Sequence, residues 1–148
     1  MNKNFQDIRT PFYYYDTALL QATLDAVRCE ISQCPDYHVH YALKANANPR
    51  LLQIIQQAGF GADCVSGGEV QAAIDAGFPA DKVVYAGVGK SDYEILTALK
   101  HDIFCFNVES VPELQVINEL SAREGKVATV CLRINPDVEA HTHTHIIT

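Results

Sequence analysis

Lys44 is the side chain of this 148-residue sequence whose position most clearly suggests chemistry. It directly follows the apolar run Tyr41-Ala42-Leu43, which is typical of the end of a buried strand. A lysine that is desolvated in such a place has a lowered pKa and can attack a carbonyl carbon to form an imine. The alternative is a lysine that lays its aliphatic stem along the sheet edge and keeps its ammonium group in water.

Two carboxylates are candidates for holding that amine. Asp63 lies in the next predicted strand, and Glu69 lies in the first turn of the helix that follows. Glu69 has a second interpretation, because the helix macrodipole favours a carboxylate in a first turn. Arg133 ends a later predicted strand, where it could bind an anion or form a surface ion pair with Asp137 or Glu139.

Two further motifs resemble ligand sites without matching them. The run Gly87-Val88-Gly89-Lys90-Ser91 lacks the earlier glycine of a phosphate-binding loop and the third glycine of a dinucleotide fingerprint. The run His141-Thr142-His143-Thr144-His145 has imidazoles at alternate positions, but no carboxylate or cysteine follows at a metal-ligand spacing. We therefore predict no metal site.

Composition excludes several classes of protein. Hydrophobic residues make up 48% of the chain and charged residues 20%, as in a globular domain. The net charge is −7 and no two basic residues are adjacent, which disfavours nucleic-acid binding. We expect no membrane span and no secretory leader. Five cysteines without a CxxC pair, three of them in predicted strands, indicate buried, reduced thiols and a cytoplasmic protein.

Short apolar strands alternate with helices along the chain. The predicted strands cover residues 38–43, 62–65, 82–88, 103–108 and 126–134. Helix starts are predicted at Asp16, Pro49, Ser66, Ser91 and Ser110, the last with a capping-box glutamate at Glu113. Strands that are apolar on both faces belong to parallel sheets whose crossovers are helices.

Two architectures fit this order of elements. An open, doubly wound sheet of the flavodoxin type has about five such units. A (β/α)₈ barrel needs about 250 residues, more than the chain offers. No helix follows the fifth predicted strand, so we expect the chain to be the first part of a longer protein.

Taken together, the motifs resemble the pyridoxal-phosphate-dependent decarboxylases of basic amino acids, which have an alanine-racemase-like barrel. The matching pieces are Thr10-Pro11-Phe12-Tyr13-Tyr14-Tyr15-Asp16, Tyr41-Ala42-Leu43-Lys44-Ala45-Asn46, Gly61-Ala62-Asp63-Cys64-Val65-Ser66-Gly67-Gly68-Glu69 and Asn107-Val108-Glu109-Ser110. A last piece, Arg133-Ile134-Asn135-Pro136 with Thr142-His143-Thr144-His145-Ile146-Ile147-Thr148, is similar to the diaminopimelate decarboxylase branch of the family.

This resemblance implies a parallel (β/α)₈ barrel of which residues 18–148 supply about the first five units. Residues 1–17 would be an N-terminal strand of a second, β-sandwich domain. Lys44 would join the aldehyde of pyridoxal 5'-phosphate as an imine and later donate a proton. Asp63 and Glu69 would hold that lysine, and Arg133 would lie beneath the cofactor. His143 and Ile146 would belong to a loop that covers the active site near the substrate.

The implied activity is decarboxylation of meso-diaminopimelate to L-lysine and CO₂ by a full-length homodimer. In the family, the phosphate-binding glycine-rich loop comes later in the chain, so we expect this part alone to be inactive. The alternatives are a decarboxylase acting on ornithine, arginine or carboxynorspermidine, an amino-acid racemase, or a non-catalytic pyridoxal-phosphate carrier. An unrelated flavodoxin-like binding module is a further alternative.

Overall fold

A computed structural model describes residues 5–136, and these residues form two compact units that meet between Asp36 and Tyr37 in the sequence. The first contains helix α1, Thr17–Ile31. Its predicted start is confirmed, because the Asp16 carboxylate accepts hydrogen bonds from the N–H groups of Ala18 (3.0 Å) and Leu19 (3.1 Å).

Residues 11–15 form no strand in the first unit. A strand needs a pairing partner for its backbone groups, and the described part of this unit offers none. Nearby, the ring of Phe5 instead contacts Phe12 at 5.8 Å and Tyr14 at 5.2 Å between centroids. The assignment of residues 1–17 to a β-sandwich domain stays a prediction, as does the domain boundary after residue 17.

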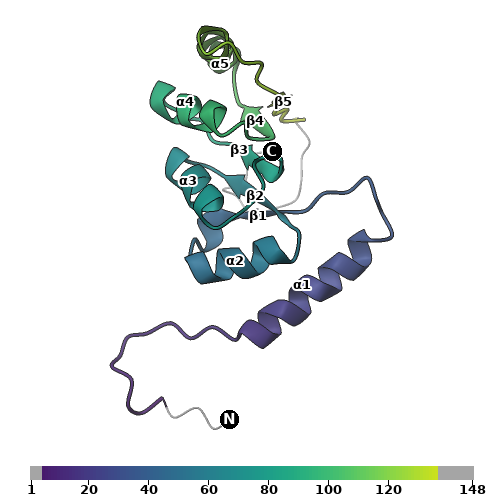
Figure 1. Cartoon of the computed structure of the whole chain (residues 1–148), viewed down its shortest axis with the longest axis vertical. Coiled ribbons are helices and arrows are strands. Elements are labelled where there is room, and N and C mark those ends of the chain that lie inside the picture. Colours follow the sequence, from purple (N-terminus) through teal and green to yellow (C-terminus); the bar gives the residue numbers. More distant parts are fainter. Residues whose placement is uncertain (1–4, 137–148) are drawn as a thin grey trace. The chain divides into compact units, whose positions relative to one another are not determined.

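The second unit alternates strands and helices along its whole described length (Figure 1). Its elements are β1 (His40–Ala42), the 3₁₀ turn η1 (Leu43–Ala45), α2 (Pro49–Gln57), β2 (Gly61–Cys64), α3 (Gly67–Asp75), the 3₁₀ turn η2 (Ala80–Lys82), β3 (Val83–Tyr85), α4 (Asp92–Lys100), β4 (Cys105–Val108), α5 (Val111–Arg123) and β5 (Val130–Leu132). Each strand and helix predicted between residues 38 and 134 is present.

The five strands form one sheet in the order β1-β2-β3-β4-β5, and all neighbours are parallel. A flavodoxin-type sheet reverses direction and has the order 2-1-3-4-5 with helices on both faces. Here the order never reverses, and Figure 1 shows α2, α3, α4 and α5 on one side of the strands. Consecutive units with one layer of helices are the arrangement of a (β/α)₈ barrel. The barrel prediction is therefore confirmed and the flavodoxin alternative is wrong.

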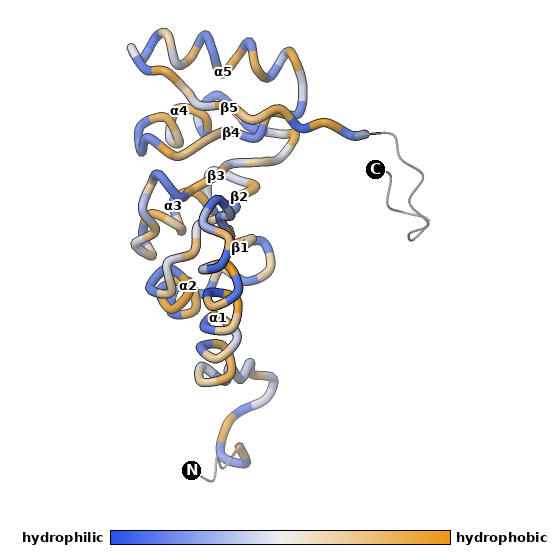
Figure 2. The backbone as a smooth tube through the Cα atoms, turned by 90° about the vertical axis from the view of Figure 1, so that its right-hand side faces the viewer, coloured by the Kyte–Doolittle hydropathy of each residue, from blue (hydrophilic) through white to orange (hydrophobic). Residues whose placement is uncertain are grey.

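The core lies between the sheet and these helices. The face of the sheet that packs against them carries residues no more than 2% exposed, namely Ala62, Cys64, Val83, Tyr85, Phe106 and Val108. The opposite face, here called the open face, carries Ala42 and the side chains in register with it on the next strands, Asp63, Val84 and Cys105. Along α5, hydrophobic and hydrophilic residues alternate as expected for a helix with one buried side (Figure 2).

A repeated Ser-x-x-Glu pattern starts three successive helices. Ser66, Ser91 and Ser110 are the N-caps of α3, α4 and α5, and each hydroxyl accepts the N–H of the glutamate three residues later. The full capping box is formed only at Ser91, where the Glu94 carboxylate also accepts the Ser91 N–H. The capping box predicted at Ser110 is half formed, because the carboxylate of Glu113 binds elsewhere.

Four of the five strands, all except β2, are shorter than predicted. The predicted strand over residues 126–134 is reduced to Val130–Leu132, which pairs on one side only within the described sheet. Lys126 is instead held by the α4 end, donating to Leu99 O at 2.6 Å and contacting Asp102 Oδ1 at 2.7 Å. No helix in residues 5–136 is long and apolar enough to cross a membrane.

All five cysteines are free thiols. Of the three in predicted strands, Cys64 and Cys105 are buried, and burial raises the pKa of both, that of Cys64 to about 12. Cys131 is exposed because β5 is an edge strand, so the prediction of buried thiols is wrong at this position.

Candidate active site

Lys44 lies in η1, immediately after the carboxyl end of β1. This turn is held by local hydrogen bonds: the Tyr41 hydroxyl donates to the carbonyl of Asn46 at 3.2 Å, and the Asn46 side chain accepts the Asn48 N–H at 2.9 Å. Leu43, only 1% exposed, anchors the turn to the core. The Tyr-Ala-Leu-Lys-Ala-Asn motif thus fixes the backbone that carries the amine.

The Lys44 side chain itself is exposed, and within residues 5–136 it forms no hydrogen bond or ion pair. The expectation of a lysine desolvated among apolar neighbours is wrong for the described structure. The physical reason is that β1 is an edge strand of the described sheet, so no further strand of that sheet covers this end of the turn. The exposed amine is accessible to a carbonyl compound.

Asp63 lies beside this turn on the open face of the sheet. It pairs in register with Ala42, two residues before Lys44, and is half-buried. Its carboxylate makes no hydrogen bond within the described part of the chain. The Asp63 carboxylate also affects the pKa of His40. Burial lowers this pKa, and the negative charge of Asp63 opposes that shift.

Glu69 stabilises the start of α3. Its Oε2 atom accepts the Val65 N–H at 2.8 Å, and its own N–H bonds to the Ser66 hydroxyl. No bond to Lys44 is formed within the described residues. The second interpretation of Glu69, a carboxylate at a helix start, is confirmed, and its role in holding Lys44 stays a prediction.

Arg133 follows β5 and pairs with a carboxylate that the sequence did not reveal as its partner. Its Nη1 atom lies 3.1 Å from Oε2 of Glu109, which follows the neighbouring strand β4. The arginine side chain is 58% exposed and the glutamate 11%. The partners considered from sequence, Asp137 and Glu139, lie outside the described residues, as do His143 and Ile146.

A second residue that sequence reasoning left without a role is Lys90, whose side chain is 1% exposed. Its Nζ atom contacts Glu113 Oε1 at 2.6 Å and donates to the carbonyls of Gly87 (2.7 Å) and Asn107 (2.9 Å). It also lies 5.2 Å from the ring centroid of Tyr85. These contacts of Lys90 with Gly87, Asn107 and Glu113 are here called the Lys90 joint. The glycine-lysine run after β3 therefore has a structural role and is not a phosphate loop.

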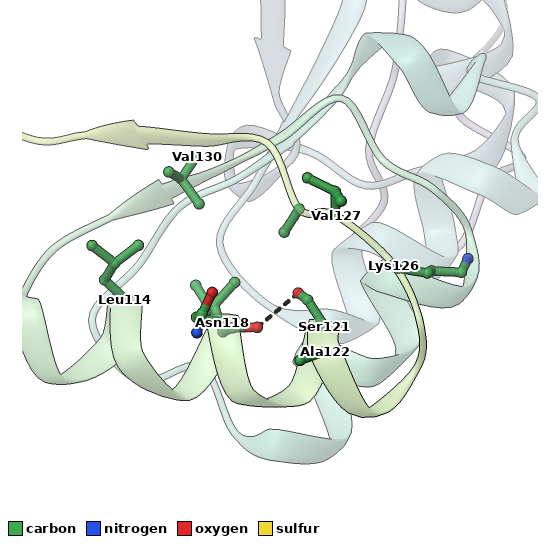
Figure 3. Close-up of a pocket in the computed structure, with 9 residues that line it drawn as sticks. Leu114, Asn118, Ser121, Ala122, Lys126, Val127 and Val130 are labelled. Atoms are coloured by element: carbon green, nitrogen blue, oxygen red, sulfur yellow. Dashed lines mark hydrogen bonds between the residues drawn. The ribbon is translucent and has the colours of Figure 1, made fainter.

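One hollow of the second unit lies away from these residues. A cavity of about 230 Å³ separates α5 from the segment that leads into β5 (Figure 3). Leu114, Val127 and Val130 line it together with Ser121, whose hydroxyl is already bonded to the Ile117 carbonyl. It contains none of the candidate catalytic residues and is not part of the site.

The family model for the pyridoxal-binding domain of pyridoxal-dependent decarboxylases matches residues 21–148. The chain belongs to this family. It is 62% identical over 144 residues to the diaminopimelate decarboxylase of Bacteroides thetaiotaomicron, a match that covers 97% of this chain and 37% of that protein.

Two solved structures are similar to this chain. The crystal structure of Helicobacter pylori diaminopimelate decarboxylase complexed with L-lysine is similar with a TM-score of 0.88 and 41% identity, over 96% of this chain and 36% of that one. A lysine/ornithine decarboxylase from Vibrio vulnificus complexed with putrescine has a TM-score of 0.73 at 23% identity, over 88% and 34% of the two chains, and shows the fold alone. This chain spans about a third of the length of these relatives.

The described residues fit one end of pyridoxal phosphate. They supply an accessible primary amine, a carboxylate and a guanidinium: Lys44 follows β1, Asp63 lies in β2 and Arg133 follows β5. Phosphate groups favour helix N-termini. Those of α3, α4 and α5 are already bonded by the chain's own glutamates. The site therefore fits the aldehyde and ring, and the phosphate loop later in the chain stays a prediction.

Proposed function

We propose that this chain supplies the lysine-bearing first part of the barrel of a pyridoxal-phosphate-dependent amino-acid decarboxylase. The observation that carries the proposal is Lys44, an accessible amine held by a rigid turn at the carboxyl end of the first barrel strand. Functional groups of such barrels lie at this end of the strands.

Three residues of the chain, Lys44, Asp63 and Arg133, would each have a separate role. Lys44 Nζ supplies the amine that holds the cofactor aldehyde and carries a proton to the substrate carbon. Asp63 supplies the negative charge nearest in register to that turn, which favours the protonated amine. Arg133 offers hydrogen-bond donors to the polar groups of the ring. Pyridoxal phosphate, when bound, supplies the electron sink for the carbon that loses CO₂.

The substrate we propose is meso-diaminopimelate, with L-lysine and CO₂ as products of the full-length protein. The supporting observation is the 62% identity to a diaminopimelate decarboxylase, against 23% to a lysine/ornithine decarboxylase. A relative that binds L-lysine in its crystal structure supports the product. We further propose a cytoplasmic homodimer.

The test is CO₂ release by the complete natural protein with pyridoxal phosphate, from a panel of meso-diaminopimelate, lysine, ornithine and arginine. We expect turnover with diaminopimelate and its loss in Lys44→Ala. Faster turnover of ornithine or arginine would contradict the substrate, and racemisation without CO₂ release would contradict the reaction. Residues 1–148 alone are expected to release no CO₂.

A further inference from the structure

The ion pair between Arg133 and Glu109 is asymmetric. Only Nη1 of the guanidinium is engaged within residues 5–136, at 3.1 Å and 3.4 Å from the two oxygens of Glu109. The carboxylate is 11% exposed and the arginine side chain 58%. The glutamate side chain is therefore the more constrained member of the pair. The other N–H groups of the arginine side chain form no hydrogen bond with a described residue.

Glu109 is held by one hydrogen bond to its carboxylate and another from its backbone N–H. Its Oε1 atom accepts the Gly87 N–H at 3.3 Å, and its own N–H donates to Glu113 Oε2 at 2.8 Å. The other oxygen of Glu113 holds the buried ammonium of Lys90, which binds the Gly87 carbonyl in turn. These bonds join the loop after β3, the end of β4 and the start of α5. Such closed networks hold a side chain in one orientation.

The register places this pair on the open face. Val108 pairs with Leu132, and the Arg133 N–H continues the ladder to the Val108 carbonyl at 2.9 Å. Because Val108 is buried against the helices, the next residues, Glu109 and Arg133, are at positions of the opposite face. Asp63 lies on the same open face.

We propose that Glu109 is a positioning residue that orients the Arg133 guanidinium toward the cofactor held by Lys44. This inference rests on the proposed function. Without the carboxylate, a long, exposed arginine would sample many rotamers, and ordering it would weaken cofactor binding. The Lys90–Glu113 pair holds the backbone of Glu109 through the bond from the Glu109 N–H to Glu113 Oε2.

The experiment measures pyridoxal phosphate affinity of the complete protein by absorbance titration, together with melting of the cofactor-free protein. Glu109→Gln keeps the shape and the Gly87 bond but removes the charge. We expect Glu109→Gln and Arg133→Gln each to weaken binding about tenfold, the size of one lost charge-assisted hydrogen bond. The double variant is expected to bind no more weakly than Arg133→Gln, because Glu109 acts through the arginine.

The matched control is Glu119→Gln, which breaks another glutamate–arginine pair, with Arg123 at 3.8 Å on the exposed side of α5. We expect it to leave affinity unchanged. Normal affinity in Glu109→Gln, or effects that multiply to about a hundredfold in the double variant, would overturn the positioning role. If Glu109→Gln melts too low to assay, the same cycle uses Glu109→Asp. Absence of binding by the unmodified protein would instead overturn the proposed function, and this inference with it.

Discussion

Glu94 joins two helices through a single carboxylate. Its Oε1 atom accepts the Gly67 N–H at the start of α3 (2.8 Å), and its Oε2 atom accepts the N–H of Ser91 at the start of α4 (3.0 Å). These bonds, that to Ser91 first, hold the pKa of Glu94 below its usual range. The ionised form is therefore favoured by folding.

The pH dependence of stability follows from that direction. A carboxyl whose pKa is lowered on folding stabilises the protein above its unfolded pKa, and this contribution is lost as the pH falls toward the folded value. We expect Glu94→Gln to lower the free energy of unfolding by about 1 kcal/mol at neutral pH. The difference from the unmodified protein should shrink below the usual glutamate pKa of 4.5. Urea melts across the pH range measure this, and a difference independent of pH would contradict it.

At the residue scale, the sequence was sufficient to place Lys44 just after the first strand and Asp63 in the second, and for the helix-start interpretation of Glu69. It was insufficient for the partner of Arg133. Glu109 and Arg133 are 24 positions apart, and they meet only because of the register in which β4 and β5 pair. The burial of Lys90 could not be predicted from the sequence either, because its partners Asn107 and Glu113 lie on two other elements.

At the element scale, β1 and β2 approach each other closely at Gly61. A Cβ at this position would collide with the His40 ring and lie 2.6 Å from the backbone oxygen of Lys82. We expect Gly61→Ala to lower stability by about 1–3 kcal/mol, because the backbone cannot move aside freely. The matched control is Gly89→Ala, where a Cβ meets nothing within 4 Å. Equal stability of the two variants in denaturant melts would contradict this packing.

The buried Lys90 joint gives a second element-scale prediction. Lys90→Met leaves the carboxylate of Glu113, 12% exposed, without its cation. Breaking such a pair from one side costs about 3–5 kcal/mol. Lys82→Met is the control, because this exposed lysine donates only to the Gly59 carbonyl. A loss in Lys90→Met no larger than in Lys82→Met would show that the joint is not buried in solution.

Helix starts were predictable because the Ser-x-x-Glu caps are local in sequence. Strand ends were not, since pairing decides them: β5 is three residues long and lies at the edge of the described sheet. The Lys44 turn was read as the end of a strand, but its Tyr41 and Asn46 bonds close a 3₁₀ turn instead.

At the scale of the whole molecule, apolar side chains in β5 and in the segments that flank it are exposed. Val127 is 98% exposed, Leu132 60% and Ile134 79%. Exposed apolar strands at a sheet edge associate with one another. We expect residues 1–148 alone to self-associate in sedimentation velocity, and Leu132→Lys to shift the distribution toward monomer. A monomer at all concentrations would contradict this expectation.

The order of the strands also belongs to this scale. Spacing alone left a doubly wound sheet and a barrel both open, because the two differ in which strands become neighbours and in which faces the helices cover, and not in the order of elements along the chain. The consecutive order β1-β2-β3-β4-β5 resolves the choice. Because all strands are parallel, Lys44 and Arg133 follow the carboxyl ends of β1 and β5, the two outer strands of the described sheet.

We propose that the Lys44 amine holds the cofactor. Borohydride reduction of the complete protein with pyridoxal phosphate, followed by proteolysis and mass spectrometry, identifies the lysine that does so. We expect the reduced pyridoxyl group on the peptide that contains Lys44, and no labelled peptide from Lys44→Arg. A pyridoxyl group on any other lysine, with the Lys44 peptide unmodified, would contradict the assignment.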